Sequence, residues 1–250
     1  MPASKVSVVL PCLNEKDNIV PLVRRILALL PPPREVLVVD DDSPDGTADA
    51  VRLEFSGHPE VRLLVRAGGR GLASALRYGI ALASGDIVAW MDCDFSMPPE
   101  RLAALVAAVR DGSCDAAVGS RFAAGGVDRR LGCRSLVLVV QAVLSLIISR
   151  LAMLLLRRRL RDWTSGFIAV RRDALTQSSL RGDFGEYFIV LVNSLLDRGC
   201  RVRELPYEFG LRRHGASKIA GSLGGLFRRG PKYVLAVLDC LPPRKWTQRP

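Results

Sequence analysis

The sequence predicts an α/β fold in which a mostly parallel sheet is flanked by helices. Short β-branched runs alternate along the chain with longer helical patterns, Pro or Gly separates them, and no internal repeat is visible. With 250 residues, 49% of them hydrophobic, the chain is long enough to bury a substantial core. A disordered chain is therefore not expected.

Five strands are expected from short apolar runs that end in polar residues. They cover residues 5–10, 35–40, 61–65, 86–91 and 115–119. The helices expected between them cover residues 18–30, 47–55, 71–83 and 98–110. Ligands of such a sheet bind beyond the carboxyl ends of its strands, so the polar residues that follow each strand are the candidates for function.

The first candidate is the triplet Asp92-Cys93-Asp94, which follows the fourth expected strand. Two carboxylates in this spacing offer a hard divalent cation two oxygen ligands and leave room for substrate oxygens. A cation held there could bridge a diphosphate and stabilise the charge of a departing nucleotide. The alternative is a solvated turn, because such a triplet is common by itself.

The second candidate is the run Asp40-Asp41-Asp42 after the second expected strand. Adjacent carboxylates repel one another unless they bind cations or hydrogen-bond donors, and one of these could accept hydrogen bonds from a nucleobase or a ribose. Residues 42–47 also fit a turn followed by a helix cap. Both interpretations can hold, with Asp40 and Asp41 functional and Asp45 structural.

The first βα turn, residues 11–15, reads PCLNE and lacks the glycines that admit a dinucleotide pyrophosphate. This composition argues against a nicotinamide-dependent enzyme. Residues 69–74 look like a broken G-x-G-x-x-G, but they follow the third strand, so the start of a helix is favoured.

Charge is divided unevenly between the halves of the chain, whose net charge is +11. Residues 1–120 hold 12 basic and 16 acidic side chains, whereas residues 121–250 hold 24 and 9. The basic half indicates an anionic partner, which could be a diphosphate-bearing metabolite, an acidic membrane surface or nucleic acid. Aromatic residues make up only 6% of the chain and do not alternate with basic ones, so nucleic acid is not expected as a partner.

Some basic residues adjoin glycine-containing turns, where a backbone loop can close over a ligand. Guanidinium groups match the geometry of phosphate oxygens, and lysine adds a point charge. The candidates for phosphate contacts are Arg121, Arg212, Arg213 and Lys218.

Residues 135–156 form an apolar segment with one charged residue, Arg150, and are long enough to cross a bilayer as a helix. Gln141, Ser145 and Ser149 recur every four residues, a polar stripe typical of a helix that lies in the membrane interface. Arginines flank both ends, so the positive-inside rule assigns no orientation. A single crossing would place the DCD triplet and the RRHGASK segment on opposite sides of the membrane. An interfacial helix or hairpin is therefore preferred, and a buried core helix is the alternative.

Seven motifs follow one another along the chain: PCLNE, VVDDDSPDGT, GLASALRYGIALASGD, WMDCDFSMPPE, GSRF, DWTSGF and RRHGASK. Together they resemble the dolichyl-phosphate (polyprenyl-phosphate) mannosyltransferases of glycosyltransferase family 2, over residues 5–225. The resemblance implies a GT-A fold with a C-terminal interfacial helical region. The catalytic domain would cover residues 1–230, including the apolar segment 134–160, and residues 231–250 would form a helix end and a flexible tail.

The resemblance also implies roles for individual residues, carried over by position in the motifs. The nucleotide-sugar pocket would be lined by Pro11, Leu13, Glu15, Asp40, Asp41, Asp92, Ser165 and Gly166. Mg²⁺ or Mn²⁺ would be held by Asp92, Asp94 and Ser96. The catalytic residues would be Asp94, Arg121, Arg212 and Lys218.

This sequence departs from the family pattern directly after the acidic triplet. Phe95-Ser96-Met97 stands where the family more usually has Leu followed by Gln-His or Ser-His. Ser96 can still offer an oxygen to a cation, whereas Met97 cannot replace a histidine.

The function implied is the inverting transfer of a hexose to a dolichyl or polyprenyl phosphate at the cytoplasmic face of a membrane. GDP-mannose is the first choice of donor. The alternatives are transfer from UDP-glucose or another UDP-sugar to the same lipid, and a non-catalytic membrane protein that binds nucleotide sugars. The six cysteines are scattered without C-x-x-C pairs, which fits a reducing compartment. No protein partner is indicated.

Overall fold

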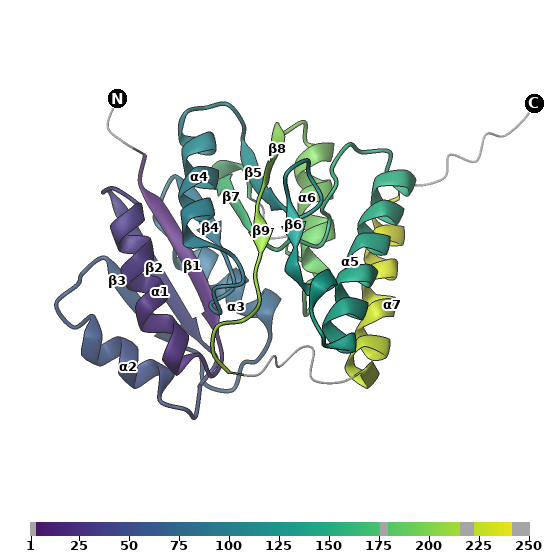
Figure 1. The fold of residues 1–250 in the computed structure, drawn as a ribbon. Coiled ribbons are helices and arrows are strands. Elements are labelled where there is room, and N and C mark those ends of the chain that lie inside the picture. The colour runs from purple at the N-terminus through teal and green to yellow at the C-terminus, as the bar shows by residue number, and fades with distance from the viewer. Residues whose placement is uncertain (1–3, 176–179, 216–222, 242–250) are drawn as a thin grey trace, which may run out of the picture.

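The chain folds into a seven-stranded sheet with helices on both faces (Figure 1). The computed structural model describes residues 4–175, 180–215 and 223–241. In spatial order the strands are β3 (Val61–Val65), β2 (Arg34–Asp40), β1 (Val6–Cys12), β4 (Ile87–Trp90), β7 (Ile168–Arg171), β5 (Ala116–Ser120) and β8 (Val202–Pro206). All neighbouring pairs are parallel except those made by β7, which runs antiparallel to β4 and β5.

The helices divide between two hydrophobic cores, one on each face of the sheet. The first core lies under α1 (Lys16–Leu29), α2 (Thr47–Glu54) and α4 (Pro99–Arg110). The second lies under α3 (Leu72–Leu82), α5 (Leu136–Leu155), α6 (Tyr187–Asp197) and α7 (Leu223–Asp239). Successive strand residues point to opposite faces, so Val8 and Leu10 enter the first core and Val9 the second.

Every strand and helix expected from the sequence is present, with each boundary within two residues of its expected position. The α/β fold with a mostly parallel sheet is confirmed. The structure adds β7, α6 and β8, which had not been expected. It also has a two-stranded sheet of β6 (Val127–Asp128) and β9 (Glu208–Phe209), and the 3₁₀ helices η1 (Arg129–Gly132) and η2 (Arg172–Ala174).

The polar stripe of α5 faces the protein and not the surroundings, which is the reverse of the side expected for it in an interfacial helix. Ser149 is fully buried and its Oγ accepts a hydrogen bond of 3.1 Å from the backbone N–H of Trp163, and the Nε2 atom of Gln141 is also buried. The exposed side of α5 is instead apolar: Val143, Ile147 and Leu154 are 40%, 55% and 73% exposed. A polar stripe inside a long apolar helix therefore marks its packed side here.

The apolar exposed surface continues from α5 onto α7, which packs beside it (Figure 1). Among the described side chains of α7, the exposed large apolar ones are Val234, Leu235 and Leu238. Within the described residues, α5 is the one helix whose length and composition would allow it to cross a membrane, and about a fifth of it is buried. A buried core helix is thus not what the structure shows. Helix α7 runs across residue 230, and residues 242–250, expected to be a flexible tail, lie outside the described residues.

Candidate active site

Acidic residues from separate segments converge at the carboxyl ends of β1 and β4, around the guanidinium group of Arg212. Arg212 lies in the segment that follows β9. Its Nη1 donates a 3.1 Å hydrogen bond to Asp94 Oδ2, and its Nη2 bonds to Glu15 Oε1. One arginine therefore joins the turn after β1 to the loop after β4. Arg212 lies 197 positions after Glu15 in the sequence.

The loop after β4 holds the carboxylate of Asp94 in a fixed orientation. The backbone N–H and the Oγ of Ser96 donate to Asp94 Oδ1 over 3.0 Å and 2.6 Å. The carbonyl of Asp94 accepts a 3.0 Å hydrogen bond from the N–H of Arg213. One Asp94 oxygen is thus held by its own loop, and the other faces Arg212.

Backbone strain gathers at the same edge of the sheet. Among the described residues, four that are not glycine have a positive φ, and three of them follow β1, β2 and β4: Asn14 at 52°, Asp42 at 56° and Phe95 at 64°. Left-handed backbone costs side-chain-bearing residues free energy and persists where the surrounding structure imposes it. The strand ends that carry the acidic motifs are therefore also the strained ones.

Asp92 lies beside these groups, at the start of the loop after β4. Burial, together with the neighbouring carboxylates of Asp94 and Glu15, raises the pKa of Asp92 to about 7, against the opposing effect of Arg212. Clustered carboxylates share protons because their charges repel. A cation placed here would relieve that repulsion.

Glu15 directly precedes α1 and is held from several directions. Its N–H donates to Thr47 Oγ1 over 2.9 Å, and its Oε2 accepts a 2.9 Å hydrogen bond from Asn18 Nδ2. The Oδ1 atom of Asn18 is buried without a hydrogen-bond partner in the described part of the chain. Pro11 and Leu13, in the same turn, are half-buried, and the carbonyl of Pro11 accepts from the thiol of Cys93 over 3.4 Å.

Asp40 and Asp41 of the acidic run after β2 are each bound by a different set of groups within the protein. Asp40 is fully buried, and its carboxylate accepts from Ser43 and from the thiol of Cys12. Asp41 is almost buried; it accepts a two-pronged bond from Arg66, and its Oδ2 accepts a 2.9 Å hydrogen bond from Gly71 N. In this structure Asp40 supports its own turn, while Asp41 joins β2 to the start of α3.

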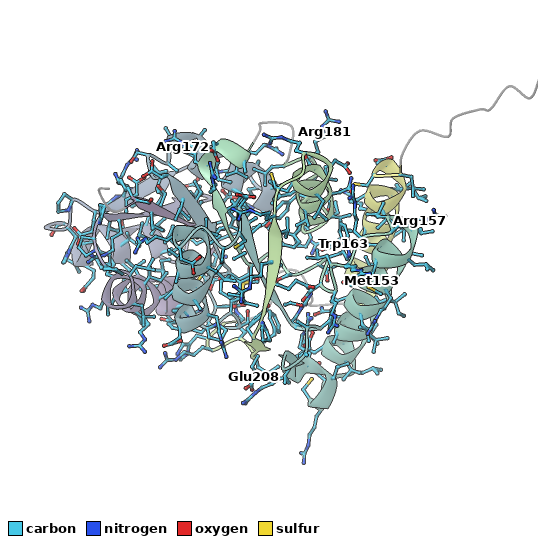
Figure 2. The ribbon with its side chains drawn as sticks, turned by 90° about the horizontal axis from the view of Figure 1, so that it is seen from above. Met153, Arg157, Trp163, Arg172, Arg181 and Glu208 are labelled. Atoms are coloured by element: carbon cyan, nitrogen blue, oxygen red, sulfur yellow. The ribbon has the colours of Figure 1, made fainter. Side chains whose placement is uncertain are left out.

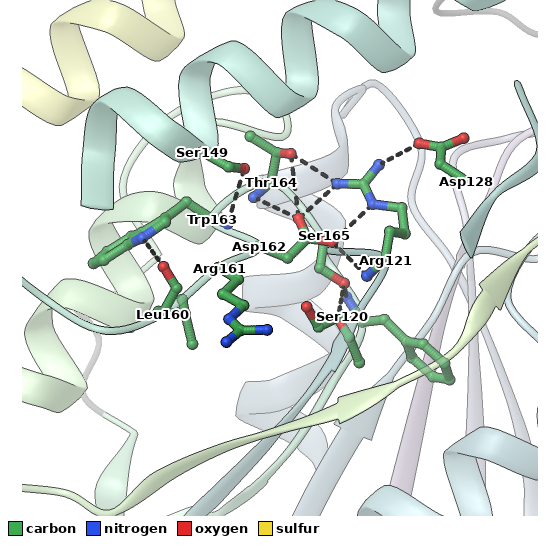
Figure 3. A network of polar contacts seen from close by, with 12 residues as sticks. Ser120, Arg121, Asp128, Ser149, Leu160, Arg161, Asp162, Trp163, Thr164 and Ser165 are labelled. Atoms are coloured by element: carbon green, nitrogen blue, oxygen red, sulfur yellow. Dashed lines mark hydrogen bonds and ion pairs between the residues drawn. The ribbon is translucent and has the colours of Figure 1, made fainter. Parts of the chain in front are cut away.

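Arg121 lies in an enclosed ion-pair network (Figure 3). It is 4% exposed, and its Nε and Nη2 donate to the two oxygens of Asp162 over 2.8 Å and 2.7 Å. Its Nη2 also donates to Thr164, and Asp128 lies 3.7 Å from its Nη1. The guanidinium group thus fixes the 162–166 loop to the end of β5.

Ser165 and Gly166 belong to that loop and approach the same edge of the sheet. Ser165 Oγ donates a 2.5 Å hydrogen bond to the carbonyl of Gly119. Gly166 has a φ of 71°, and a Cβ at this position would lie 3.7 Å from the hydroxyl of Tyr187. Tyr187 in turn accepts a 2.9 Å hydrogen bond from the indole of Trp90 in β4.

The structure therefore brings Glu15, Asp92, Asp94 and Arg212 together, and places Ser96 as the support of Asp94. Lys218 lies outside the described residues. Sequence reasoning missed Asn18, Arg66 and Asp162. Asp162 stands in the DWTSGF motif, but its pairing with Arg121, 41 positions earlier, is set by tertiary packing and left no local signal. Asp45 is structural, as expected: its carboxylate accepts from the N–H groups of Lys16 and Thr47.

Asp92 and Asp94 offer the chemistry that a divalent cation of the Mg²⁺ type requires. Among the described residues, no group of three or more His, Cys, Asp and Glu side chains is arranged to hold a metal ion. Mg²⁺ is commonly held by one or two carboxylates, with substrate phosphates and water completing its shell. Two carboxylates beside a strained loop fit that kind of site.

Comparison with known proteins gives the family. Residues 7–178 match the family described as Glycosyl transferase family 2. The chain belongs to glycosyl transferase family 2. It is therefore a glycosyltransferase, and the resemblance seen in its motifs is confirmed.

Two relatives illustrate the similarity. The chain is 36% identical over 225 residues to a dolichol-phosphate mannosyltransferase of Pyrococcus furiosus, an alignment that covers 87% of this chain and 60% of that protein. It is 34% identical over 228 residues to polyprenol monophosphomannose synthase of Mycolicibacterium smegmatis, covering 88% of this chain and 83% of the relative. This chain thus spans less than two thirds of the Pyrococcus protein.

Solved structures agree on the fold. Glucosyl-3-phosphoglycerate synthase of Mycobacterium tuberculosis, in complex with Mn²⁺, UDP and phosphoglyceric acid, superposes with a TM-score of 0.69 at 22% identity. The match covers 96% of this chain and 80% of the synthase. The expected GT-A fold is confirmed.

Proposed function

We propose that the protein transfers mannose from GDP-mannose to a dolichyl or polyprenyl phosphate, with inversion at the anomeric carbon, at the cytoplasmic face of a membrane. The observation that carries this proposal is the convergence of Glu15, Asp94 and Arg212 at the carboxyl edge of the sheet. Carboxylates and a guanidinium group side by side suit a ligand that brings both a cation and a diphosphate. The names of the two relatives support mannose as the sugar and a dolichol or polyprenol phosphate as the acceptor.

Asp92 and Asp94 would hold Mg²⁺ or Mn²⁺, with the hydroxyl of Ser96 orienting Asp94. When bound, the cation neutralises negative charge on the leaving diphosphate. Arg212 would turn from the carboxylates toward the diphosphate, and Lys218 would act beside it. The arginine that balances the acidic cluster in the free protein would thus balance the phosphates in the complex.

The remaining pocket residues would position the donor. Pro11, Leu13 and Glu15 would line the nucleotide side, with Asp41 held toward it by Arg66. Ser165 and Gly166 would shape the sugar side, in a loop that Arg121 fixes through Asp162. Positioning of this kind supplies much of the rate of a transfer between two bound substrates.

A phosphate acceptor removes the need for a strong general base. The second pKa of a phosphate monoester is about 6, so the acceptor oxygen is largely ionised at neutral pH. His58 pairs with Glu60 beside β3, away from the acidic edge. In-line attack on an α-linked donor then yields a β-linked product.

Membrane association is supported by the exposed apolar face of α5 and α7, which would lie in the membrane interface. No disulfide joins any of the six cysteines, all of which lie in the described part of the chain, and this fits the reducing cytoplasmic side. The net positive charge of residues 121–250 suits an acidic leaflet.

A donor panel tests the proposal. Purified protein, Mn²⁺ and a polyprenyl phosphate are incubated separately with GDP-mannose, UDP-glucose and UDP-N-acetylglucosamine, and the extracted lipid is analysed by mass spectrometry and NMR. Of the three donors, we expect only GDP-mannose to give a product, which should be a β-linked polyprenyl phosphate mannose. A product from a UDP-sugar only would make the protein a different hexosyltransferase, and an α-linked product would contradict inversion.

A further inference from the structure

A cleft of about 660 Å³ lies at the end of the sheet opposite the acidic edge. Its walls are the segment that precedes β5, the segment that follows α5 and the start of β8. Because β5 and β8 are parallel, the cleft lies at their amino ends, a strand length away from the candidate active site. Five arginines line this arginine cleft: Arg157, Arg158, Arg159, Arg201 and Arg203.

Two of the five arginines are neutralised by carboxylates. Arg158 Nη2 lies 2.6 Å from Asp197, and Arg201 bonds through two nitrogens to Asp115 at 3.0 Å and 3.1 Å. These pairs build the walls of the cleft and leave little charge to attract a ligand.

The one carboxylate among the lining residues, that of Glu204, is bound by backbone N–H groups and not by the arginines. Glu204 accepts hydrogen bonds of 2.9 Å and 3.0 Å from the N–H groups of Arg161 and Asp162. Arg157, Arg159 and Arg203 form no ion pair within the part of the chain that the structure describes, and the contact of Arg203 is Ser113 Oγ at 3.4 Å. Three guanidinium groups without a close ion pair among the described residues therefore face one cleft, and Asp111 acts on Arg203 only from beyond ion-pair distance.

The position of these arginines is not explained by helix chemistry alone. Arg157 has a φ of 53°, the fourth strained residue of the described chain, at a helix end where glycine is the usual residue. The dipole of α5 favours basic residues directly after the helix. It does not account for Arg203, which comes from β8.

We propose that the arginine cleft binds the phosphate of an anionic phospholipid headgroup. Guanidinium forks match phosphate oxygens, and three unpaired ones supply the charge complement of an anionic group. Leu154 and Leu155, three and two positions before Arg157, are exposed and apolar, so the cleft lies beside the apolar face of α5 and α7. Figure 2 shows Arg157 on the side of the molecule formed by these helices, with Met153 one turn earlier. The proposal rests on the membrane association in the proposed function.

Headgroup binding here would fix the orientation of the protein on the membrane. A helix of 20 residues is about 30 Å long, so α5 separates the arginine cleft from the end of the molecule that carries the acidic edge. An apolar face alone allows the protein to tilt on the membrane surface. A polar contact at one end of α5 limits this tilt and keeps the acidic edge at a constant height above the bilayer.

Vesicle flotation with the full chain tests the proposal. The variant Arg159→Gln/Arg203→Gln is compared with the native protein on phosphatidylcholine vesicles and on vesicles that also contain phosphatidylglycerol. Each basic residue at an anionic leaflet contributes about fivefold to affinity, so the variant should bind the anionic vesicles about twenty-five-fold more weakly. Its binding to phosphatidylcholine vesicles, through the apolar face, should equal that of the native protein.

The matched control is Arg52→Gln/Arg101→Gln, which removes the same charge from exposed residues of α2 and α4 on the other face of the sheet. It should bind both vesicles like the native protein; an equal loss in both variants would mean general charge attraction and overturn the proposal. Unchanged vesicle binding by the cleft variant would also overturn the proposal. This holds even if calorimetry shows that the cleft variant no longer binds inorganic phosphate, because the cleft would then bind a free anion and not a headgroup. Should the double variant unfold in a melting experiment, Arg203→Gln alone should lose about fivefold.

Flotation needs no donor, so the two proposals fail separately. Protein that shows the headgroup effect but transfers no sugar contradicts the proposed function and leaves the cleft assignment intact. Protein that transfers mannose to an acceptor in detergent but lacks the headgroup effect contradicts the cleft assignment alone.

Discussion

The guanidinium group of Arg121 is buried against Asp162, and this contact predicts what its removal does. Arg121→Ala leaves a buried carboxylate without its partner, which should lower the free energy of unfolding by about 3 kcal/mol or more. Urea unfolding at neutral pH measures the change. The free energy of unfolding of Arg121→Lys should lie between those of the native protein and Arg121→Ala, because lysine keeps the charge but not the two-pronged hydrogen bond. Native stability combined with lost sugar transfer would instead place this arginine on the substrate.

Arg212 balances the charge of Glu15 and Asp94 in the free protein, so its removal should affect cation binding even without a donor. A unit charge several ångströms from a cation is worth more than 1 kcal/mol at an effective dielectric constant of about 20. Arg212→Gln should therefore bind Mn²⁺ about tenfold more tightly in the absence of GDP-mannose, yet transfer mannose at least about tenfold more slowly. Electron paramagnetic resonance of free Mn²⁺ gives the affinity; an unchanged value would separate Arg212 from the cation site.

For single residues, the sequence shows which residue types stand at the strand ends, but not which of them are bound by other side chains of the same protein. Asp94 and Arg212 were predictable from the DCD and RRHGASK motifs, and they do meet. Asp40 and Arg121 stand in equally clear motifs, yet both are buried in internal contacts. Asp40 is held by Ser43, three residues later in its own turn, and by Cys12 of the neighbouring strand. Arg121 is held by Asp162, whose approach is set by tertiary packing.

At the scale of elements, Glu35 joins the beginnings of β1 and β2 to the turn before β4. Burial raises its pKa, but hydrogen bonds from Ser7 Oγ at 2.6 Å and Ser84 N at 2.7 Å outweigh this and lower the pKa from 4.5 to about 2. Because the folded pKa lies below the unfolded one, the stabilisation is present above about pH 4.5 and is lost as the pH falls toward 2.

Glu35→Gln should therefore remove a contribution of roughly 3 kcal/mol at neutral pH and flatten the acid limb of the stability curve. Urea unfolding between pH 7 and pH 3 compares the variant with the native protein. If both lose stability in parallel on acidification, other carboxyl groups account for the acid sensitivity.

The elements of the first 120 residues were predictable because each apolar run has a clear period and ends at Pro, Gly or an acidic turn. The later ones were not. β7 is four residues long and runs antiparallel between β4 and β5, a position set by pairing with strands far away in the sequence. The apolar run predicted the helix α5, but it did not predict which side of the helix packs against the protein. The contact between Ser149 and Trp163 decides that side.

At the scale of the whole molecule, the exposed side of α5 should carry membrane binding that salt does not abolish. Burying an exposed Val, Ile or Leu is worth about 1.5 kcal/mol or more, so Val143→Ser/Ile147→Ser/Leu154→Ser should weaken vesicle binding at least about a hundredfold. Detergent should release the native protein. Leu53→Ser on α2, where the leucine is 84% exposed, is the control and should bind normally. Vesicle binding that survives in the triple variant would assign the membrane contact to another surface.

In the proposed function, the acidic edge of the sheet catalyses mannosyl transfer to a lipid phosphate. The most direct measurement is the rate at which labelled mannose passes from GDP-mannose to a polyprenyl phosphate with Mn²⁺ present, for native protein and for Asp94→Asn. We predict transfer by the native protein that stops with excess EDTA, and a loss of at least about a hundredfold in Asp94→Asn, which removes a ligand charge but little volume. Native rates in the variant or in EDTA, or no lipid-linked mannose at all, would contradict the claim.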